Sequence, residues 1–62
     1  LFIYLNEPGR HHVQIFDIAG RQKYSVTISG YQRLDIPGLN RGINYLRVTS
    51  AKDVYAKRIN VF

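Results

Sequence analysis

The sequence predicts an all-β domain: a small immunoglobulin-like antiparallel β-sandwich of about six to seven short strands. Apolar, β-branched segments recur at intervals of about ten residues, separated by turn-forming Gly, Pro, Asn or Ser. No segment shows the 3.6-residue period of an amphipathic helix. Together these observations favour two packed antiparallel sheets, and a five-stranded barrel is the alternative.

The segment 13–21 organises this prediction, because it joins a strand pattern, a turn and a positive charge. Alternation places Val13 and Ile15 on one face of the strand, while further apolar residues fall on the other face. Gly20 stands where the chain must reverse, and glycine readily takes the positive φ of tight hairpin turns. The pattern predicts an inner strand that runs into a turn displaying Arg21.

Turn residues bound each of the other expected strands, which carry β-branched or aromatic side chains. The opening apolar run is short enough to be a buried strand. Strict alternation puts Tyr24, Val26 and Ile28 on one face of the third strand. The glycine-bracketed loop 38–42 is long enough to lead from one sheet to the other. The complete set of expected strands is 1–5, 11–18, 24–28, 31–36, 43–49 and 54–62.

Length and composition indicate one small domain over residues 1–62, which we expect to be a fragment of a longer protein. The chain has no cysteine, so neither disulfides nor thiolate metal sites are available. No apolar run approaches the length of about 20 residues that spans a bilayer, so we expect no membrane insertion. The net charge of +5 favours anionic partners, although the cations are scattered along the chain.

The chemically reactive side chains of the sequence do not form the pattern of an enzyme active site. His11 and His12 are adjacent in an expected strand, so they point to opposite faces and do not share a metal ion. The carboxylates fall mostly in expected turns or at outward positions. The serines lack a nucleophile-elbow context, and the glycines form no phosphate loop. We therefore expect no catalytic residues, no metal and no cofactor.

Nucleic-acid binding is a further functional class to consider, because small basic β-domains bind single-stranded nucleic acids by stacking the bases on aromatic side chains. Here the aromatic residues alternate with aliphatic ones, and no cluster of basic and aromatic residues stands out. We therefore expect most of them to fill the core, and we expect no nucleic-acid partner. The residues concerned are Tyr4, Phe16, Tyr24, Tyr31, Tyr45 and Tyr55.

Two blocks and the ending of the chain resemble the C-terminal sorting domain of type IX secretion cargo in Bacteroidetes. The block Val13-Gln-Ile-Phe-Asp-Ile-Ala-Gly-Arg21 is similar to the family's strand, aromatic-Asp pair and Gly-Arg turn. The segment 36–48 resembles its second block, a short strand and a glycine before a strand containing Arg or Lys. The ending 57–62 resembles its basic, then alternating apolar, terminus. The chain departs from the family at Asn44 and Phe62 and lacks its Pro-Asn-Pro strand.

This resemblance implies a targeting role at the C-terminus of a larger exported protein. In the family, the type IX machinery recognises such a domain in the periplasm and carries the cargo through the outer-membrane translocon. A sortase-like peptidase then usually removes the domain and attaches the cargo to the cell surface. The resemblance therefore implies an exported protein, in the periplasm in transit and then on the surface or secreted.

Partner recognition is expected at two turns and along the last strand. An edge strand offers unpaired amides and carbonyls to a receptor strand, with apolar side chains as anchors and cations beside them. Guanidinium groups at the Gly-Arg turn and on the fifth strand suit an acidic receptor or anionic lipopolysaccharide. The expected recognition residues are Gly20, Arg21, Gly42, Arg47, Lys57, Arg58, Ile59, Val61 and Phe62.

Each of these residues also has a purely structural interpretation. Gly20 and Arg21 would then only build the turn, with Arg21 paired to Asp17 or to another exposed carboxylate, and the last strand would only complete the sheet. The whole domain would be a structural or adhesive sandwich module of a surface protein without a sorting role. With six strands, the sandwich is one strand short of an immunoglobulin-like domain, so the free edge at 1–5 also predicts a homodimer.

Overall fold

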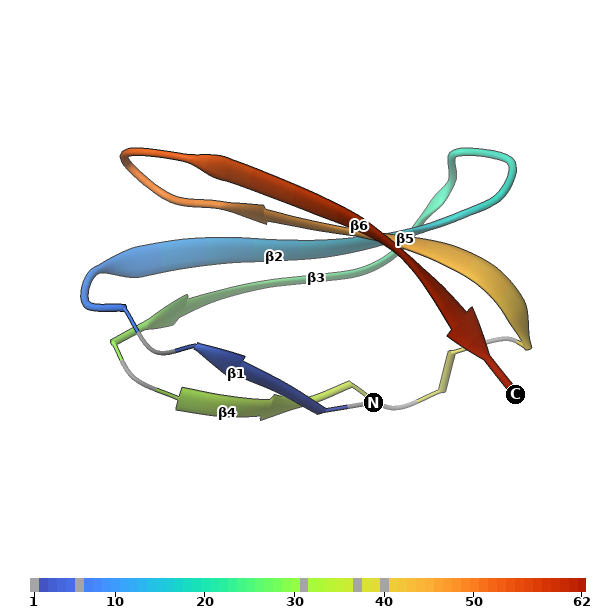
Figure 1. The fold of residues 1–62 in the computed structure, drawn as a ribbon, viewed down its shortest axis with the longest axis horizontal. Helices are drawn as coiled ribbons and strands as arrows, with labels where there is room; N and C mark the ends of the chain where they lie inside the picture. Colours follow the sequence, from blue (N-terminus) through green and yellow to red (C-terminus); the bar gives the residue numbers. More distant parts are fainter. Residues whose placement is uncertain (1, 6, 31, 37, 40) are drawn as a thin grey trace.

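The computed structural model describes residues 2–5, 7–30, 32–36, 38–39 and 41–62, with Gln32 described by its backbone only. It contains six strands and no helix in these residues, hence no helix long and apolar enough to cross a membrane. Figure 1 shows their arrangement. The strands are β1 (Phe2–Leu5), β2 (Arg10–Asp17), β3 (Gln22–Ser29), β4 (Gln32–Asp35), β5 (Gly42–Thr49) and β6 (Val54–Val61).

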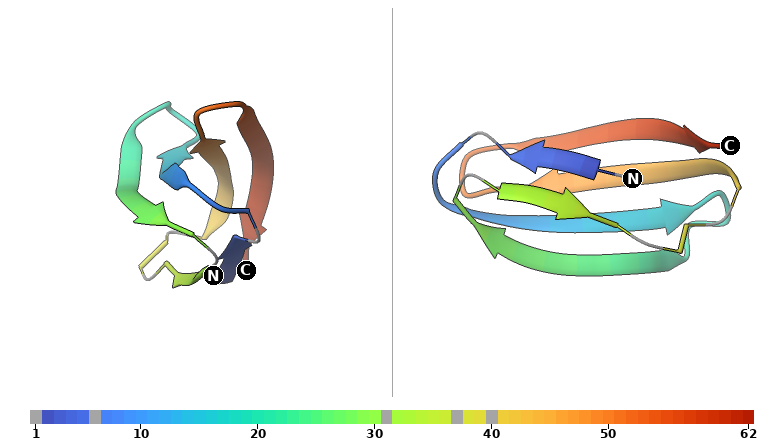
Figure 2. Two further views of the ribbon diagram at one scale, coloured as in Figure 1. Left: turned by 90° about the vertical axis from the view of Figure 1, so that its left-hand side faces the viewer. Right: turned by 90° about the horizontal axis from the view of Figure 1, so that it is seen from below.

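The strands form two antiparallel sheets that lie as two layers (Figures 1 and 2). The larger sheet has the order β3-β2-β5-β6, and the smaller sheet pairs β1 with β4. The chain passes from the small sheet to the large one between β4 and β5, as the glycine-bracketed loop predicted. The all-β, sandwich-like prediction is therefore confirmed. The expected roles of Leu1, Asn6, Tyr31, Pro37 and Asn40 in strands or turns lie outside the described residues.

The core lies between the two sheets and is aliphatic. Val13 and Ile15 of β2 are fully buried, and Ile36 and Leu46 complete the buried cluster. Strand β2 is central because it pairs with β3 on one side and with β5 on the other. The prediction of an inner strand that buries Val13 and Ile15 is confirmed.

The strand β2 ends one residue earlier than the sequence pattern indicated. The register between β2 and β3 shifts at this end: Ile15 pairs with Tyr24, but Phe16 pairs with Gln22. Such a shift is typical of a bulge, in which one strand has an extra residue. Asp17 then begins the turn, so Ile18 leaves the strand and is 72% exposed. In β3 the expected alternation is confirmed, since Tyr24, Val26 and Ile28 are half-buried and the residues between them are exposed.

Two predictions about packing are wrong. The opening run does not form a strand buried on both faces: Phe2 is 51% and Tyr4 70% exposed, because no other strand of the described structure covers the outer face of β1, where the Arg33 guanidinium stands over the Phe2 ring. The aromatic residues do not fill the core either. Tyr45 and Tyr55 are also exposed, while Phe16 and Tyr24 are only half-buried. Branched aliphatic side chains occupy the narrow space between the sheets instead.

Candidate recognition surface

The Gly-Arg turn after β2 is held together by one carboxylate. Asp17 Oδ1 accepts hydrogen bonds from the backbone N–H groups of Ala19 and Arg21, each at 2.9 Å. Arg21 Nε donates to Asp17 Oδ2 at 3.0 Å, and Gly20 has the positive φ of 85° that the turn requires. The predicted pairing of Arg21 with Asp17 is therefore confirmed.

These contacts change the acidity of Asp17. The backbone N–H of Arg21 is the largest influence and lowers the pKa of this carboxyl below its ordinary value. The Arg21 guanidinium and the Ala19 N–H lower it further, whereas partial burial opposes them. Hydrogen bonds and cations favour the charged form of a carboxyl group. Asp17 is thus a structural anion that fixes the turn.

Arg47 lies on the outer face of the large sheet and is fixed by its neighbours. Its Nε and Nη2 atoms donate to Gln14 Oε1 at 3.1 and 2.8 Å. Its guanidinium carbon also stands 5.0 Å from the centroid of the Phe16 ring, a cation–π arrangement. The side chain is held in one orientation while the residue remains exposed to solvent.

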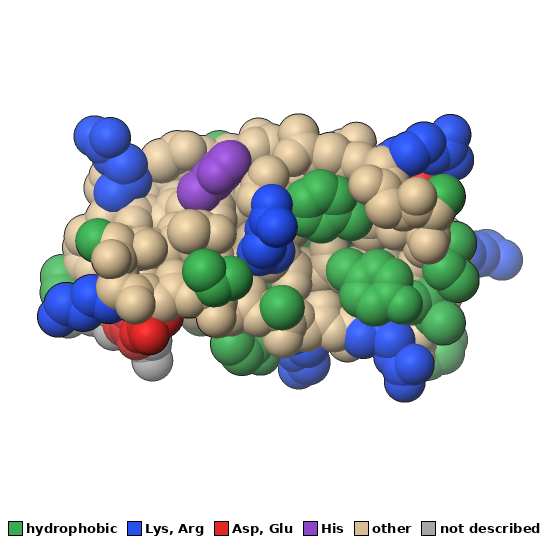
Figure 3. All heavy atoms as spheres, turned by 90° about the horizontal axis from the view of Figure 1, so that it is seen from above, with side chains coloured by type: hydrophobic (Ala, Val, Ile, Leu, Met, Phe, Trp, Pro, Cys, Tyr) green, Lys and Arg blue, Asp and Glu red, His purple; other side chains and the backbone are tan. Residues whose placement is uncertain are grey.

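The outer face of the large sheet is cationic. Its four strands contain a single carboxylate, Asp17, and the adjacent turn engages it. Arg58 extends the face toward its margin, opposite Tyr45 in the β5–β6 register. Figure 3 views the molecule from this side: tan atoms cover most of it, a blue side chain stands near its middle, further blue side chains lie around its margin, and red appears only near the margins. An anionic partner therefore meets little repulsion here.

Strand β6 is an edge strand, as predicted, because β5 is its partner in the large sheet and it ends the strand order. Ile59 packs against the core cluster, and Val61 is half-buried at the end of the strand. Lys57 stands opposite the buried Leu46, so it is on the inward face, whereas Arg58 is on the outward face. The two predicted cations of this strand therefore do not act on one surface.

No ion pair to Lys57 or Arg58 exists among the residues that the structure describes. Phe62 follows the strand and is fully exposed. Gly42 begins β5 with a φ of 102°, and its carbonyl accepts a 3.4 Å hydrogen bond from the side chain of the buried Asn44. Gly42 therefore shapes the backbone where the chain enters the large sheet.

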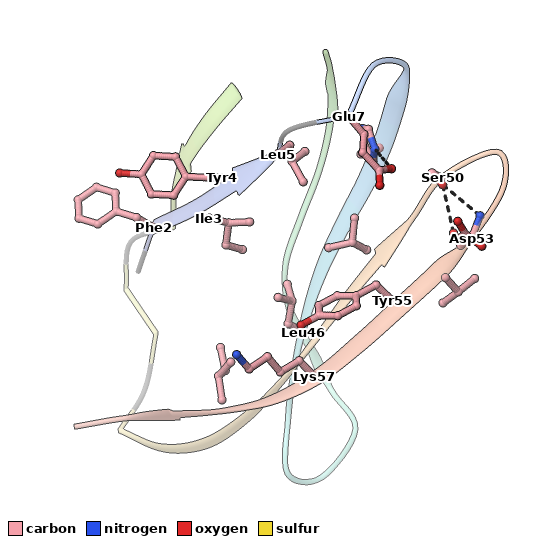
Figure 4. Close-up of a pocket in the computed structure, with 14 residues that line it drawn as sticks. Phe2, Ile3, Tyr4, Leu5, Glu7, Leu46, Ser50, Asp53, Tyr55 and Lys57 are labelled. Carbon is pink, nitrogen blue, oxygen red and sulfur yellow. Dashed lines mark hydrogen bonds and ion pairs between the residues drawn. The ribbon is translucent and has the colours of Figure 1, made fainter. Parts of the chain in front are cut away.

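A groove between β1 and the β5–β6 hairpin was not predicted from the sequence. It has a volume of about 660 Å³. Figure 4 shows Ile3 and Leu5 on one side, with Leu46, Tyr55 and Lys57 on the other. The alternation of side chains along β6 was the sequence signal that could have indicated this groove, since it places Tyr55, Lys57 and Ile59 on one face.

The residues of the described ranges bring together no group of three or more His, Asp or Glu side chains that suits a metal ion. His11 is buried and His12 half-buried on the other face of β2, as their adjacency predicted. His11 Nδ1 lies 3.1 Å from the carbonyl of Gly9, and its Nε2 lies 3.9 Å from Glu7. His12 Nε2 hydrogen-bonds Ser25 Oγ at 2.8 Å. Both histidines thus have partners within the fold.

These features define a small β-sandwich recognition domain, with a cationic outer face and an open edge at β6. A model of the family described as the secretion system C-terminal sorting domain matches residues 1–61. The chain belongs to this family, and it is a C-terminal sorting signal for type IX secretion. No curated protein and no solved structure matches the chain. Nothing in these findings favours the structural module without a sorting role.

Proposed function

We propose that the type IX machinery reads this sorting domain in its folded form along the open edge of β6. The observation that carries the proposal is the combination of a free strand edge with Arg58, an outward-facing cation that lacks an ion-pair partner in the described chain. An exposed strand edge invites pairing with another chain. A receptor strand that adds here gains main-chain hydrogen bonds, and side-chain pockets give it selectivity.

Ile59 and Val61 anchor the strand in this proposal. Ile59 reaches the core cluster, so it holds β6 in place while the opposite edge stays available. Arg58 projects beside that edge on the outward face and offers a guanidinium to an acidic receptor. Phe62, fully exposed beyond the strand, offers an apolar contact at its end.

The Gly20–Arg21 turn is a second contact in the proposal. The Arg21 side chain keeps 74% of its surface exposed although it pairs with Asp17, so it remains accessible to an anionic group. Arg47, oriented by Gln14, presents a second guanidinium on the same sheet. Gly42, like Gly20, contributes through its backbone conformation rather than through a side-chain contact.

The proposed route follows from the family. The domain passes through the periplasm, engages the outer-membrane translocon, and carries its cargo to the cell surface or the medium. A sortase then removes the domain from its cargo. The domain itself, one unit over residues 1–62, acts by recognition without catalysis, cofactor or nucleic acid, whatever the activity of its cargo.

A reporter tests the sorting role on which the proposal depends. A fluorescent protein with a periplasmic export signal is fused to this chain and expressed in a type IX-competent bacterium and in a secretion-deficient strain. We expect surface or medium fluorescence in the competent strain only. Folded reporter retained in the periplasm of both strains would refute the proposal and leave a structural module.

A homodimer through the free edge of β1, which the sequence predicted, is the alternative to a strand from another protein at that edge. Strand β1 pairs with β4 only, so one of its edges has no partner strand in the described structure. Sedimentation velocity over a range of protein concentrations tests this directly. A monomer at every concentration contradicts the homodimer without affecting the sorting role.

A further inference from the structure

The groove beside β1 is built around an incomplete sheet. All four residues of β1 line it, although this strand pairs with β4 alone. Two-stranded sheets are marginal in water, and a third strand or packing against another layer stabilises them. A segment placed along the free edge of β1 would complete a three-stranded layer beneath β5 and β6 (Figures 2 and 4).

The side chains of the groove suit an extended segment with apolar residues on one face. Ile3 and Leu5 stand on the β1 side, and Leu46, Val48 and Ile59 come from the facing sheet. Tyr55 is 55% exposed on this inward face, although its register partner Val48 packs against the core. A partner that covers this exposed apolar surface would remove it from water, and this burial would stabilise the complex.

The charges of the groove favour a ligand that carries a carboxylate. Lys57 is the one lysine or arginine among its lining residues, which also include His11, and no carboxylate pairs with Lys57 among the described residues. The acidic lining residues, Glu7 and Asp53, lie well away from Lys57 in Figure 4, and Glu7 is close to His11. Covering an ammonium group with apolar residues is costly unless a carboxylate accompanies them.

We propose that this groove binds an extended, acidic-apolar peptide segment of a partner protein, which pairs with the free edge of β1 and places a carboxylate on Lys57. The segment alternates, so that its inward positions read apolar, acidic, apolar. This inference rests on the proposed function only in assigning the partner to the secretion machinery. The site is distinct from the outer edge of β6, because it lies under the inward face of that strand.

A second copy of the chain is a poorer occupant. The strand that it would offer for edge-to-edge pairing, Phe2–Leu5, contains no carboxylate. Such pairing would leave Lys57 covered without a counter-charge. The two copies would also bring together chains that each carry a net charge of +5.

Two synthetic peptides test the proposal against the folded chain. The first, acetyl-Thr-Val-Thr-Glu-Thr-Val-Thr-amide, presents Val, Glu and Val on one face; the second has Lys in place of Glu. Titrations are followed by backbone and side-chain NMR shifts of the isotope-labelled chain. We expect saturable shifts at β1, Tyr55 and Lys57, at least about tenfold tighter binding of the Glu peptide, and weaker binding as salt increases.

Charge reversal provides the decisive variant. Lys57→Glu should exchange the preference, so that the Lys peptide binds more tightly than the Glu peptide. Lys52→Glu makes the same change of charge in the exposed turn of the same hairpin and should leave the preference unaltered. Circular dichroism and thermal unfolding establish that both variants are folded. If Lys57→Glu fails to fold, Lys57→Gln serves instead and should bind both peptides equally.

Equal binding of the two peptides by the unaltered chain, or no binding at millimolar peptide, would overturn the proposal. So would shifts confined to the outer face, or a dimer already occupying the groove in the free chain. The reporter assay separates the two proposals. Secretion of the reporter without peptide binding refutes the groove alone, whereas peptide binding without secretion refutes the sorting proposal alone.

Discussion

Strands β2 and β6 are equally long and both carry apolar residues at alternate positions, yet the fold buries their side chains to different extents. In β2, Val13 and Ile15 have no exposed surface. In β6, Val54 is 65% and Tyr55 is 55% exposed. The difference lies in the neighbours: β2 has a strand on each side, whereas β6 has β5 alone. The pattern of a strand sets its faces, but its place in the sheet sets its burial.

The cations of the molecule repeat this contrast. Arg21 pairs with Asp17, and Arg47 is bonded to Gln14 and stacked near Phe16. Lys57 and Arg58 on the marginal strand have no ion-pair partner in the described chain. The cations near the centre of the large sheet are therefore fixed by partners within the fold, whereas those of the marginal strand have no ion pair.

The largest expected effect is on stability, from a truncation in the central strand. Ile15→Ala removes a fully buried side chain and leaves a cavity, so we expect a loss of about 2–5 kcal/mol in the free energy of unfolding. Ile59→Ala in the marginal strand removes a half-buried side chain and should cost roughly 1 kcal/mol. Urea unfolding measures both. Equal losses would contradict the contrast between centre and margin.

A smaller loss is expected at the turn that follows β2. Gly20→Ala forces a side chain into a conformation with φ of +85°, which should cost about 1–2 kcal/mol. A Cβ there meets no atom within 4 Å, so the cost is conformational rather than steric crowding. Gly20→Asn is the matched control, because asparagine tolerates this region better. Thermal unfolding should rank glycine above asparagine and asparagine above alanine.

The carboxylate of the same turn should make stability depend on pH. The pKa of Asp17 is lowered in the folded state, so its ionised form stabilises the fold above its ordinary pKa. This contribution is lost as the pH falls below about 4. Asp17→Asn should therefore lose less stability on acidification than the unaltered chain. Arg21→Ala should show part of this change, and identical pH profiles for all three proteins would refute the account.

The smallest effect on stability is expected at the margin. Arg58 is exposed and has no ion-pair partner among the described residues, so Arg58→Ala should change the free energy of unfolding by about 0.5 kcal/mol or less. Chemical unfolding measures this change. A loss of several kcal/mol would show that Arg58 belongs to the fold rather than to a contact surface.

The local patterns of the sequence sufficed for the strands, the turns and the central place of β2. Alternation and glycine positions are local signals, so Val13, Ile15 and Gly20 were assigned correctly. The exposure of Tyr45 and Tyr55 was missed, because it depends on which strands cover which face. The groove was missed for the same reason: Ile3 and Ile59 are far apart in the chain and meet only when the two sheets pack. The pairing of Arg47 with Gln14 is likewise a product of sheet order.

The central claim, that the type IX machinery recognises the open edge of β6, has one direct test. The fluorescent reporter is compared with its Arg58→Glu variant and with a Lys52→Glu control of identical net charge. All three domains should fold, and the export of each is measured in the type IX-competent strain. We expect the β6 variant to remain in the periplasm and the control to be exported. Normal export of the folded β6 variant would contradict the claim.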